Sequence, residues 1–387
     1  MALNPNKPRR ASAGVSLVEL LVAMAIGLVL TMAVAVVMTN SEAGKRTANS
    51  ANDTSQTAAY TSYVLDRTLR SAGSGYAQRW GHVFGCRINA SLNNAQILPR
   101  TTPLPAPFAG VPTEFRLAPI LVSKGAGVTG SDVITVMAGT AAFGETAPQP
   151  LSGSLTADSL RLRNTLGVKG DDLILLGQQD QVGCLVQGVE PGFVGSTDQQ
   201  LRFAGSYYTA AGADVSVTSF DASGYAISIG NAADNPPQFQ MITVGANDTL
   251  FSYDVMRTGA AGDTPVAIAD GVVEMRALYG IDVNRDGILD QWVDPGAPPY
   301  DRVTLMNGSA VSRTNLRQIV ALRLGLILRT SLIERQLVSP SDVVLFNDLG
   351  AALKQTRTLS VDEQHMRHRA VEITIPLRNV LLAPAVP

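Results

Sequence analysis

Histidine and cysteine, which build many catalytic and metal centres, are scarce in this chain. Its 387 residues include three histidines and two cysteines. His365 and His368 stand three positions apart, but no cysteine or further acid lies in register with them, so they make a poor zinc site. No Gly-x-Ser-x-Gly turn accompanies these histidines to supply a serine nucleophile. We therefore expect that the chain has no catalytic site and is not an enzyme.

Charged and aromatic residues are also few, at 16% and 5% of the chain. The formal net charge is −2, and the first 14 residues carry Lys7, Arg9 and Arg10 but no acid. Without that segment the protein would be more acidic, whereas nucleic-acid binding requires a positively charged surface. We expect neither a nucleic acid nor a small-molecule substrate. Glycine (35) and proline (21) are plentiful instead, which is typical of a loop-rich, largely β domain.

One hydrophobic run extends from Val15 to Thr39 and carries a single charge, Glu19. A helix of about 25 residues rises about 37 Å, which is enough to cross a hydrocarbon core of about 30 Å. The basic residues before the run place the N-terminus in the cytoplasm. The run is too long for an ordinary secretory signal. The sequence predicts a single-pass inner-membrane protein whose larger C-terminal part lies in the periplasm.

The residues around the start of this run are Gly14 followed by Val15-Ser-Leu-Val-Glu19-Leu. This pattern resembles a prepilin peptidase site, although Val15 replaces the commoner phenylalanine. The resemblance implies cleavage between Gly14 and Val15, N-methylation of Val15, and a role for Glu19 in subunit assembly, where it neutralises a neighbouring subunit's amine. A carboxylate within an apolar helix costs roughly 2.5–3.5 kcal/mol, so such residues are usually functional. The alternative is a plain signal anchor whose acid lies near the interface by chance.

Beyond Thr39 the helix is predicted to continue to residue 72. No proline occurs in this stretch, and Gly73-Ser-Gly75 ends the pattern. Small and apolar residues recur there at alternating spacings of three and four, which predicts one packing stripe: Ala48, Ala51, Ser55, Ala58, Ser62, Leu65, Leu69 and Ala72. The expected organisation is a leader over 1–14, a transmembrane helix over 15–39, its periplasmic half over 40–72 and an exported β-rich domain over 73–387.

After Gly75 short β-favouring runs alternate with glycine, proline and acid-rich turns. Segments 99–130 and 140–157 are predicted to be loops, and Asp270–Tyr279 is a possible helix. The predicted fold class is therefore α+β, with the long N-terminal helix packed on a mainly antiparallel sheet, as in pilins.

An acid-rich loop follows Tyr279 and gives the sharpest local chemistry. Oxygen-bearing residues recur at its positions 1, 3, 5, 7 and 9, with Gly287 at position 6: Asp282, Asn284, Asp286, the Ile288 carbonyl and Asp290. Calcium prefers this oxygen pattern. Position 12 holds Val293 instead of glutamate, so a complete EF-hand is not predicted. The candidate cofactor is Ca²⁺, and the alternative is a solvated Asn/Asp/Gly turn.

Cys86 and Cys184 are too far apart in sequence to form a metal site with the histidines. In an oxidising compartment they could form a disulfide. Closing a loop of about 100 residues would stabilise the fold by roughly 4.7 kcal/mol in the chain-entropy model. The alternative is two buried free thiols.

Tyr279-Gly280 before the acid-rich loop and the C-terminal motif RHRAVEITIPLRN at 367–379 extend the resemblance. With the prepilin start, the chain resembles PilW-type minor pilins of the type IV pilus. The resemblance implies that prepilin peptidase, the inner membrane, other minor pilins and the major pilin are its partners. It further implies a role in priming pilus assembly near the tip, supporting twitching motility and adhesion. Alternatives are a pseudopilin of a type II secretion system and a membrane-anchored periplasmic adhesin or enzyme.

Overall fold

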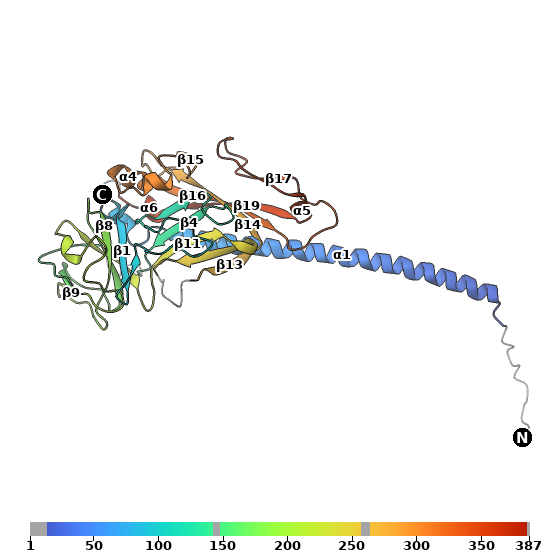
Figure 1. The fold of residues 1–387 in the computed structure, drawn as a ribbon, viewed down its shortest axis with the longest axis horizontal. Helices are drawn as coiled ribbons and strands as arrows, with labels where there is room; N and C mark the ends of the chain where they lie inside the picture. Colours follow the sequence, from blue (N-terminus) through green and yellow to red (C-terminus); the bar gives the residue numbers. More distant parts are fainter. Residues whose placement is uncertain (1–13, 142–147, 257–263, 385–387) are drawn as a thin grey trace, which may run out of the picture. The chain divides into compact units, whose positions relative to one another are not determined.

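A computed structural model describes residues 14–141, 148–256 and 264–384 (Figure 1). The chain divides into two compact units, Met1–Asp53 and Thr54–Pro387. Leader residues 1–13, part of the predicted cleaved segment, lie outside the described residues.

A single helix, α1, extends over Leu17–Arg70 and contributes to both units. Its 54 residues correspond to about 81 Å. The predicted transmembrane and periplasmic segments are therefore parts of one continuous helix. Alanine, leucine, methionine and valine fill its first half, and no proline interrupts it. Gly73 and Gly75 follow its end with φ values of 76° and 82°, which other residues rarely adopt.

The second unit buries one face of α1, but only from Ala58 onward. The buried positions are spaced three or four apart: Ala58, Thr61, Leu65 and Leu69, followed by Ala72 just beyond the end of the helix. Ala48, Ala51 and Ser55, which were predicted to continue this stripe, are exposed. The helical period identified the correct face, but it could not show how far along the helix the domain extends.

The domain has three larger sheets. Within them, every pair of neighbouring strands except β1 and β8 is antiparallel. The six-stranded sheet has the order β2 (Ala95–Leu98), β1 (Arg87–Leu92), β8 (Gly183–Gly188), β7 (Asp172–Gly177), β10 (Tyr225–Asn231) and β5 (Gln149–Pro150). The five-stranded sheet has the order β13 (Val266–Asp270), β12 (Thr249–Asp254), β11 (Gln238–Val244), β4 (Val133–Ala138) and β3 (Ile120–Ser123).

The four-stranded sheet has the order β15 (Gln291–Val293), β14 (Val272–Ile281), β16 (Ile319–Arg329) and β19 (His368–Pro376). Two small pairs complete the strands: β6 (Ser159–Arg161) with β9 (Gln200–Arg202), and β17 (Asp342–Leu345) with β18 (Gln355–Thr358). The short helices are α2 (Trp80–Val83), α3 (Arg302–Leu305), α4 (Ala310–Gln318), α5 (Val361–Gln364) and α6 (Arg378–Leu381), with 3₁₀ turns at Ala77–Arg79, Val217–Ser219 and Ala246–Asp248. The α+β class with a long helix and mostly antiparallel sheets is confirmed.

One large hydrophobic core joins α1 to these sheets. Leu65 and Leu69 of α1 are fully buried in the same cluster as residues of all three sheets. Tyr76, just after the helix, is also fully buried, and its hydroxyl donates a 2.8 Å hydrogen bond to the carbonyl of Met137 in β4. Burial raises the pKa of Tyr76 well above its usual value, so this hydroxyl stays protonated as a donor.

Three local predictions were wrong. Asp270–Tyr279 is not helical, because Val272–Ile281 is strand β14 and pairs along its length with β16. The segment 99–130 is not all loop, because it contains β3, which pairs with β4. The segment 140–157, of which 142–147 lie outside the described residues, is not all loop either, because it contains β5, which pairs with β10. In each place, pairing with a distant strand decided the conformation, which local sequence patterns do not report.

Replacing Leu65 with alanine is expected to destabilise the domain by about 2–5 kcal/mol, because it opens a cavity in the core. Thermal unfolding of the full chain in detergent measures this loss. Tyr63→Ala is the matched control, since Tyr63 lies on the same helix but its side chain is 64% exposed. Equal melting of the two variants would contradict the assignment of the buried face.

Candidate processing and assembly site

The predicted cleavage bond between Gly14 and Val15 lies in non-helical chain immediately before α1. Both residues are exposed, and a Cβ added at Gly14 would meet nothing within 4 Å. The backbone here is outside the helical hydrogen-bond ladder, so it is accessible to a peptidase. This arrangement fits a processing site.

Glu19 lies in the first turn of α1 and takes part in a capping box with Ser16. The Glu19 backbone N–H donates to Ser16 Oγ at 3.1 Å, and the Ser16 backbone N–H donates to Glu19 Oε2 at 3.3 Å. This exchange satisfies two N–H groups that the helix itself leaves unpaired. The Ser-x-x-Glu spacing of Ser16 and Glu19 is the signal in the sequence for this cap.

The cap gives Glu19 a local structural role beside the predicted role in subunit assembly. A negative charge in the first turn also interacts favourably with the helix dipole. Glu19 nevertheless remains exposed to its surroundings. The two roles are therefore compatible, and only variants that separate the hydrogen bond from the charge can distinguish them.

The acid-rich loop connects β14 to β15 and is closed by its own backbone. Asp282, only 1% exposed, accepts hydrogen bonds from the N–H groups of Asp286 at 3.2 Å and Gly287 at 2.8 Å. At the other end of the loop, Asp290 Oδ2 accepts from the Val283 N–H at 2.7 Å. These bonds bring both ends of the loop together.

Two more of the predicted ligand oxygens accept backbone hydrogen bonds within the loop. Asn284 Oδ1 accepts from Asp286 N–H at 3.1 Å, and Asp286 Oδ1 accepts from Ile288 N–H at 2.8 Å. Over residues 14–141, 148–256 and 264–384, no group of three or more His, Cys, Asp or Glu side chains is arranged to hold a metal ion. The predicted ligands thus share one loop, and calcium binding stays a prediction.

Cys86 and Cys184 are joined in a disulfide with their Cα atoms 5.5 Å apart. Both side chains are buried. The bond lies beside the parallel pairing of β1 with β8, where Ile88 is opposite Cys184. It therefore ties the segment after α2 to the centre of the six-stranded sheet.

The three histidines do not form one cluster. His365 Nδ1 lies 2.8 Å from the carbonyl oxygen of Glu334, and His368 Nδ1 lies 3.0 Å from that of Met366. His82 instead packs edge-on against Tyr225, with ring centroids 4.7 Å apart. These contacts give the histidines structural roles.

Two family models match the chain. Residues 9–35 match the prokaryotic N-terminal methylation motif, and residues 228–379 match the model described as Type IV Pilus-assembly protein W. No curated protein and no solved structure matches it. The first match covers the processing bond, the capping box and the start of α1. The second includes the acid-rich loop and the whole four-stranded sheet.

A methylation motif on a single long helix, followed by a mostly antiparallel β domain, defines a prepilin-like protein. Within that class, residues 228–379 match the family described as Type IV Pilus-assembly protein W. Both matches are to structural families rather than enzymes. The motif implies processing by prepilin peptidase and places the chain in the context of pilus assembly with other pilins.

Mass spectrometry of the protein isolated from membranes tests the processing site. We expect the mature chain to begin with N-methylated Val15, since this bond lies in exposed, non-helical backbone. Gly14→Leu is expected to leave the leader attached. A mature protein that begins with Met1, or beyond Thr39, would contradict the assignment.

Thermal unfolding with and without calcium tests the acid-rich loop. For a protein beginning near residue 40, calcium at 100 times its dissociation constant is expected to stabilise the fold by about 2.7 kcal/mol. Asp286→Ala should abolish this effect, whereas Asp234→Ala, at an exposed acid on another loop, should not. Identical melting of the unmutated protein in calcium and in chelator would argue against a site.

Proposed function

We propose that this protein is a minor pilin that joins other minor pilins to prime type IV pilus assembly and lies near the pilus tip. In this role it supports twitching motility and adhesion. The observation that carries the proposal is the exposed carboxylate of Glu19. Glu19 lies four residues after Val15, in the first turn of α1, and no other charged residue occurs in the helix as far as Thr39.

The membrane half of α1 supports an inner-membrane anchor. By length and composition, α1 is the one helix within the described ranges that could cross a membrane. Its large apolar residues from Leu17 to Met38 are exposed, so none of the residues that the structure describes covers them. A lipid environment or the helices of other subunits would remove them from water.

A carboxylate in this environment needs a partner. The Ser16 N–H provides one hydrogen bond, but a hydrogen bond from an amide does not neutralise the charge. The amine of a neighbouring subunit's first residue would do so at close range in a medium of low dielectric. Assembly would then be favoured because it pairs a charge that is costly to leave alone.

Two substitutions separate the charge of Glu19 from its helix cap. Glu19→Gln removes the charge, while glutamine can still accept the Ser16 N–H bond in a capping box. Ser16→Ala keeps the charge and removes the hydroxyl acceptor, at a cost of about 1 kcal/mol. Each variant is expressed in a strain lacking the unmutated protein, and surface pili are counted by electron microscopy.

We expect Glu19→Gln to reduce piliation to the level of the deletion strain, with the protein still present in the inner membrane. Ser16→Ala should retain most pili. Normal piliation with Glu19→Gln would overturn the charge-pairing role. Deletion that leaves pili intact but abolishes secretion of proteins into the medium would show that the chain belongs to a type II secretion machine instead.

A further inference from the structure

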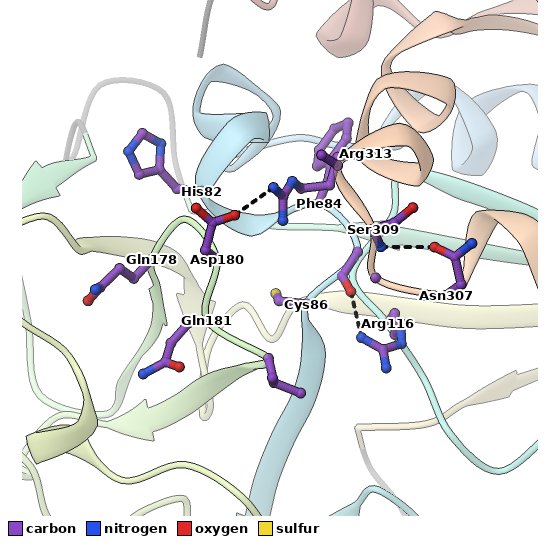
Figure 2. A pocket seen from close by; sticks show the side chains of 14 residues that line it. His82, Phe84, Cys86, Arg116, Gln178, Asp180, Gln181, Asn307, Ser309 and Arg313 are labelled. Carbon is purple, nitrogen blue, oxygen red and sulfur yellow. Dashed lines mark hydrogen bonds and ion pairs between the residues drawn. The ribbon is translucent and has the colours of Figure 1, made fainter.

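The exported domain contains a cavity of about 350 Å³ (Figure 2). Its size falls within the range of ligand-binding pockets in proteins. Four segments that are distant in the sequence form its wall: residues 82–86 at the end of α2, Arg116, residues 178–182 in the turn between β7 and β8, and residues 307–313 at the start of α4. We call it the arginine pocket, after Arg116 and Arg313.

The two arginine side chains are enclosed, whereas the acids that pair with them are in solvent. The side chains of Arg116 and Arg313 are 15% and 14% exposed. Their partners Glu114 and Asp180 are 44% and 77% exposed, at 3.1 Å and 2.9 Å respectively. Ion pairs with such exposed acids contribute little to stability. The positive charge is therefore fixed in place, and the negative charge is easily replaced.

Gly308 and Gly85 border the two arginines, and Gly308 makes room for the Arg116 guanidinium. A Cβ added at Gly308, whose φ is 76°, would lie only 2.6 Å from Arg116 Nη1. Gly85, with φ of 75°, lies against Arg313, whose Cγ would be 3.5 Å from an added Cβ. The Gly85 carbonyl also accepts a 3.0 Å hydrogen bond from Arg116 Nη1. The backbone thus holds Arg116 in one orientation.

One nitrogen of Arg116 is shut off from the pocket as well as from the protein's own acceptors. Its Nε is buried, and within the part of the chain that the structure describes it has no hydrogen-bond partner. His82 Nδ1, on the same pocket wall, is likewise buried without one. The start of α4 is already capped, because Ser309 Oγ accepts from the Ser312 N–H at 3.1 Å. Recognition of a ligand in this pocket therefore depends on the arginines rather than on the helix end.

The remaining lining indicates what kind of ligand fits. Gln178, Gln181 and Asn307 also line the pocket, and each of their amides already makes a hydrogen bond within the protein. Val182, on the rim, is 57% exposed. A guanidinium binds a carboxylate through paired hydrogen bonds, and an apolar side chain can pack against an exposed valine. A cavity of this size has room for more than a single small ion.

We propose that the arginine pocket binds an acidic peptide segment of a partner protein, with a carboxylate on Arg116 and Arg313 and an apolar neighbour against Val182. Asp180 holds Arg313 in the absence of this partner and is displaced by the incoming carboxylate. This inference goes beyond the role in pilus assembly, because it requires neither Glu19 nor the membrane helix.

Fluorescence anisotropy with the full chain in detergent tests the proposal. The probe is the fluorescein-labelled peptide Gly-Val-Glu-Val-Gly, amidated at its C-terminus, and its counterpart has glutamine in place of glutamate. We expect saturable binding of the acidic peptide and at least tenfold weaker binding of the counterpart. Inorganic phosphate should compete only at concentrations at least tenfold above those of the unlabelled peptide.

Three variants identify the pocket as the binding site. Arg313→Gln should weaken binding at least tenfold, whereas Arg202→Gln, at an exposed arginine on β9, should not change it. Asp180→Asn removes the competing acid and should tighten binding two- to fivefold. Because Asp180 is 77% exposed, this variant should fold normally, and a gain in affinity cannot result from misfolding.

Equal binding of the two peptides, or unchanged affinity with Arg313→Gln, would overturn the proposal. Unchanged or weaker binding with Asp180→Asn would overturn the displacement of that acid. Competition by phosphate at peptide concentrations would show a general anion site rather than a peptide site. None of these outcomes depends on whether pili assemble.

Discussion

The packing of α1 against the β domain is the constraint on which the rest of the structure depends. From Ala58 to Leu69 one face of the helix is buried in the same hydrophobic cluster as residues of all three sheets. Burying Leu65 and Leu69 removes large apolar side chains from water, at roughly 25 cal/mol per Å². The same helix has its apolar membrane half exposed, so it joins a segment suited to lipid to a folded domain.

This division explains why charged groups occur where they do. Along the membrane half, Glu19 is the lone acid, and its capping bonds to Ser16 partly compensate for its environment. In the domain, buried acids are surrounded by hydrogen-bond donors. Asp132, for example, accepts from the N–H groups of Gly125 and Ala277, both at 2.9 Å, and pairs with Arg276. Burial still raises the pKa of Asp132, because desolvation outweighs these bonds.

The proposed sites depend on the core to different degrees. The processing bond needs only a non-helical segment before α1 and is therefore local in sequence. The acid-rich loop is local as well, but Gln318 of α4 holds it by accepting from Asp282 N–H and by donating to the Val283 carbonyl at 3.0 Å. The arginine pocket is not local at all, since Arg116 and Arg313 are distant in the sequence and line one pocket only in the folded domain.

The sequence by itself determined the features that depend on neighbours in the chain: the apolar run, the capping signal at Ser16 and Glu19, the acid-rich loop, and the helical face that includes Leu65. Short-range hydrogen bonds and the 3.6-residue period encode these directly. Only the tertiary structure decided that Val272–Ile281 is a strand, that the stripe is buried from Ala58, and that two arginines share a pocket. Those outcomes result from contacts between distant segments, which leave no periodic signal along the chain.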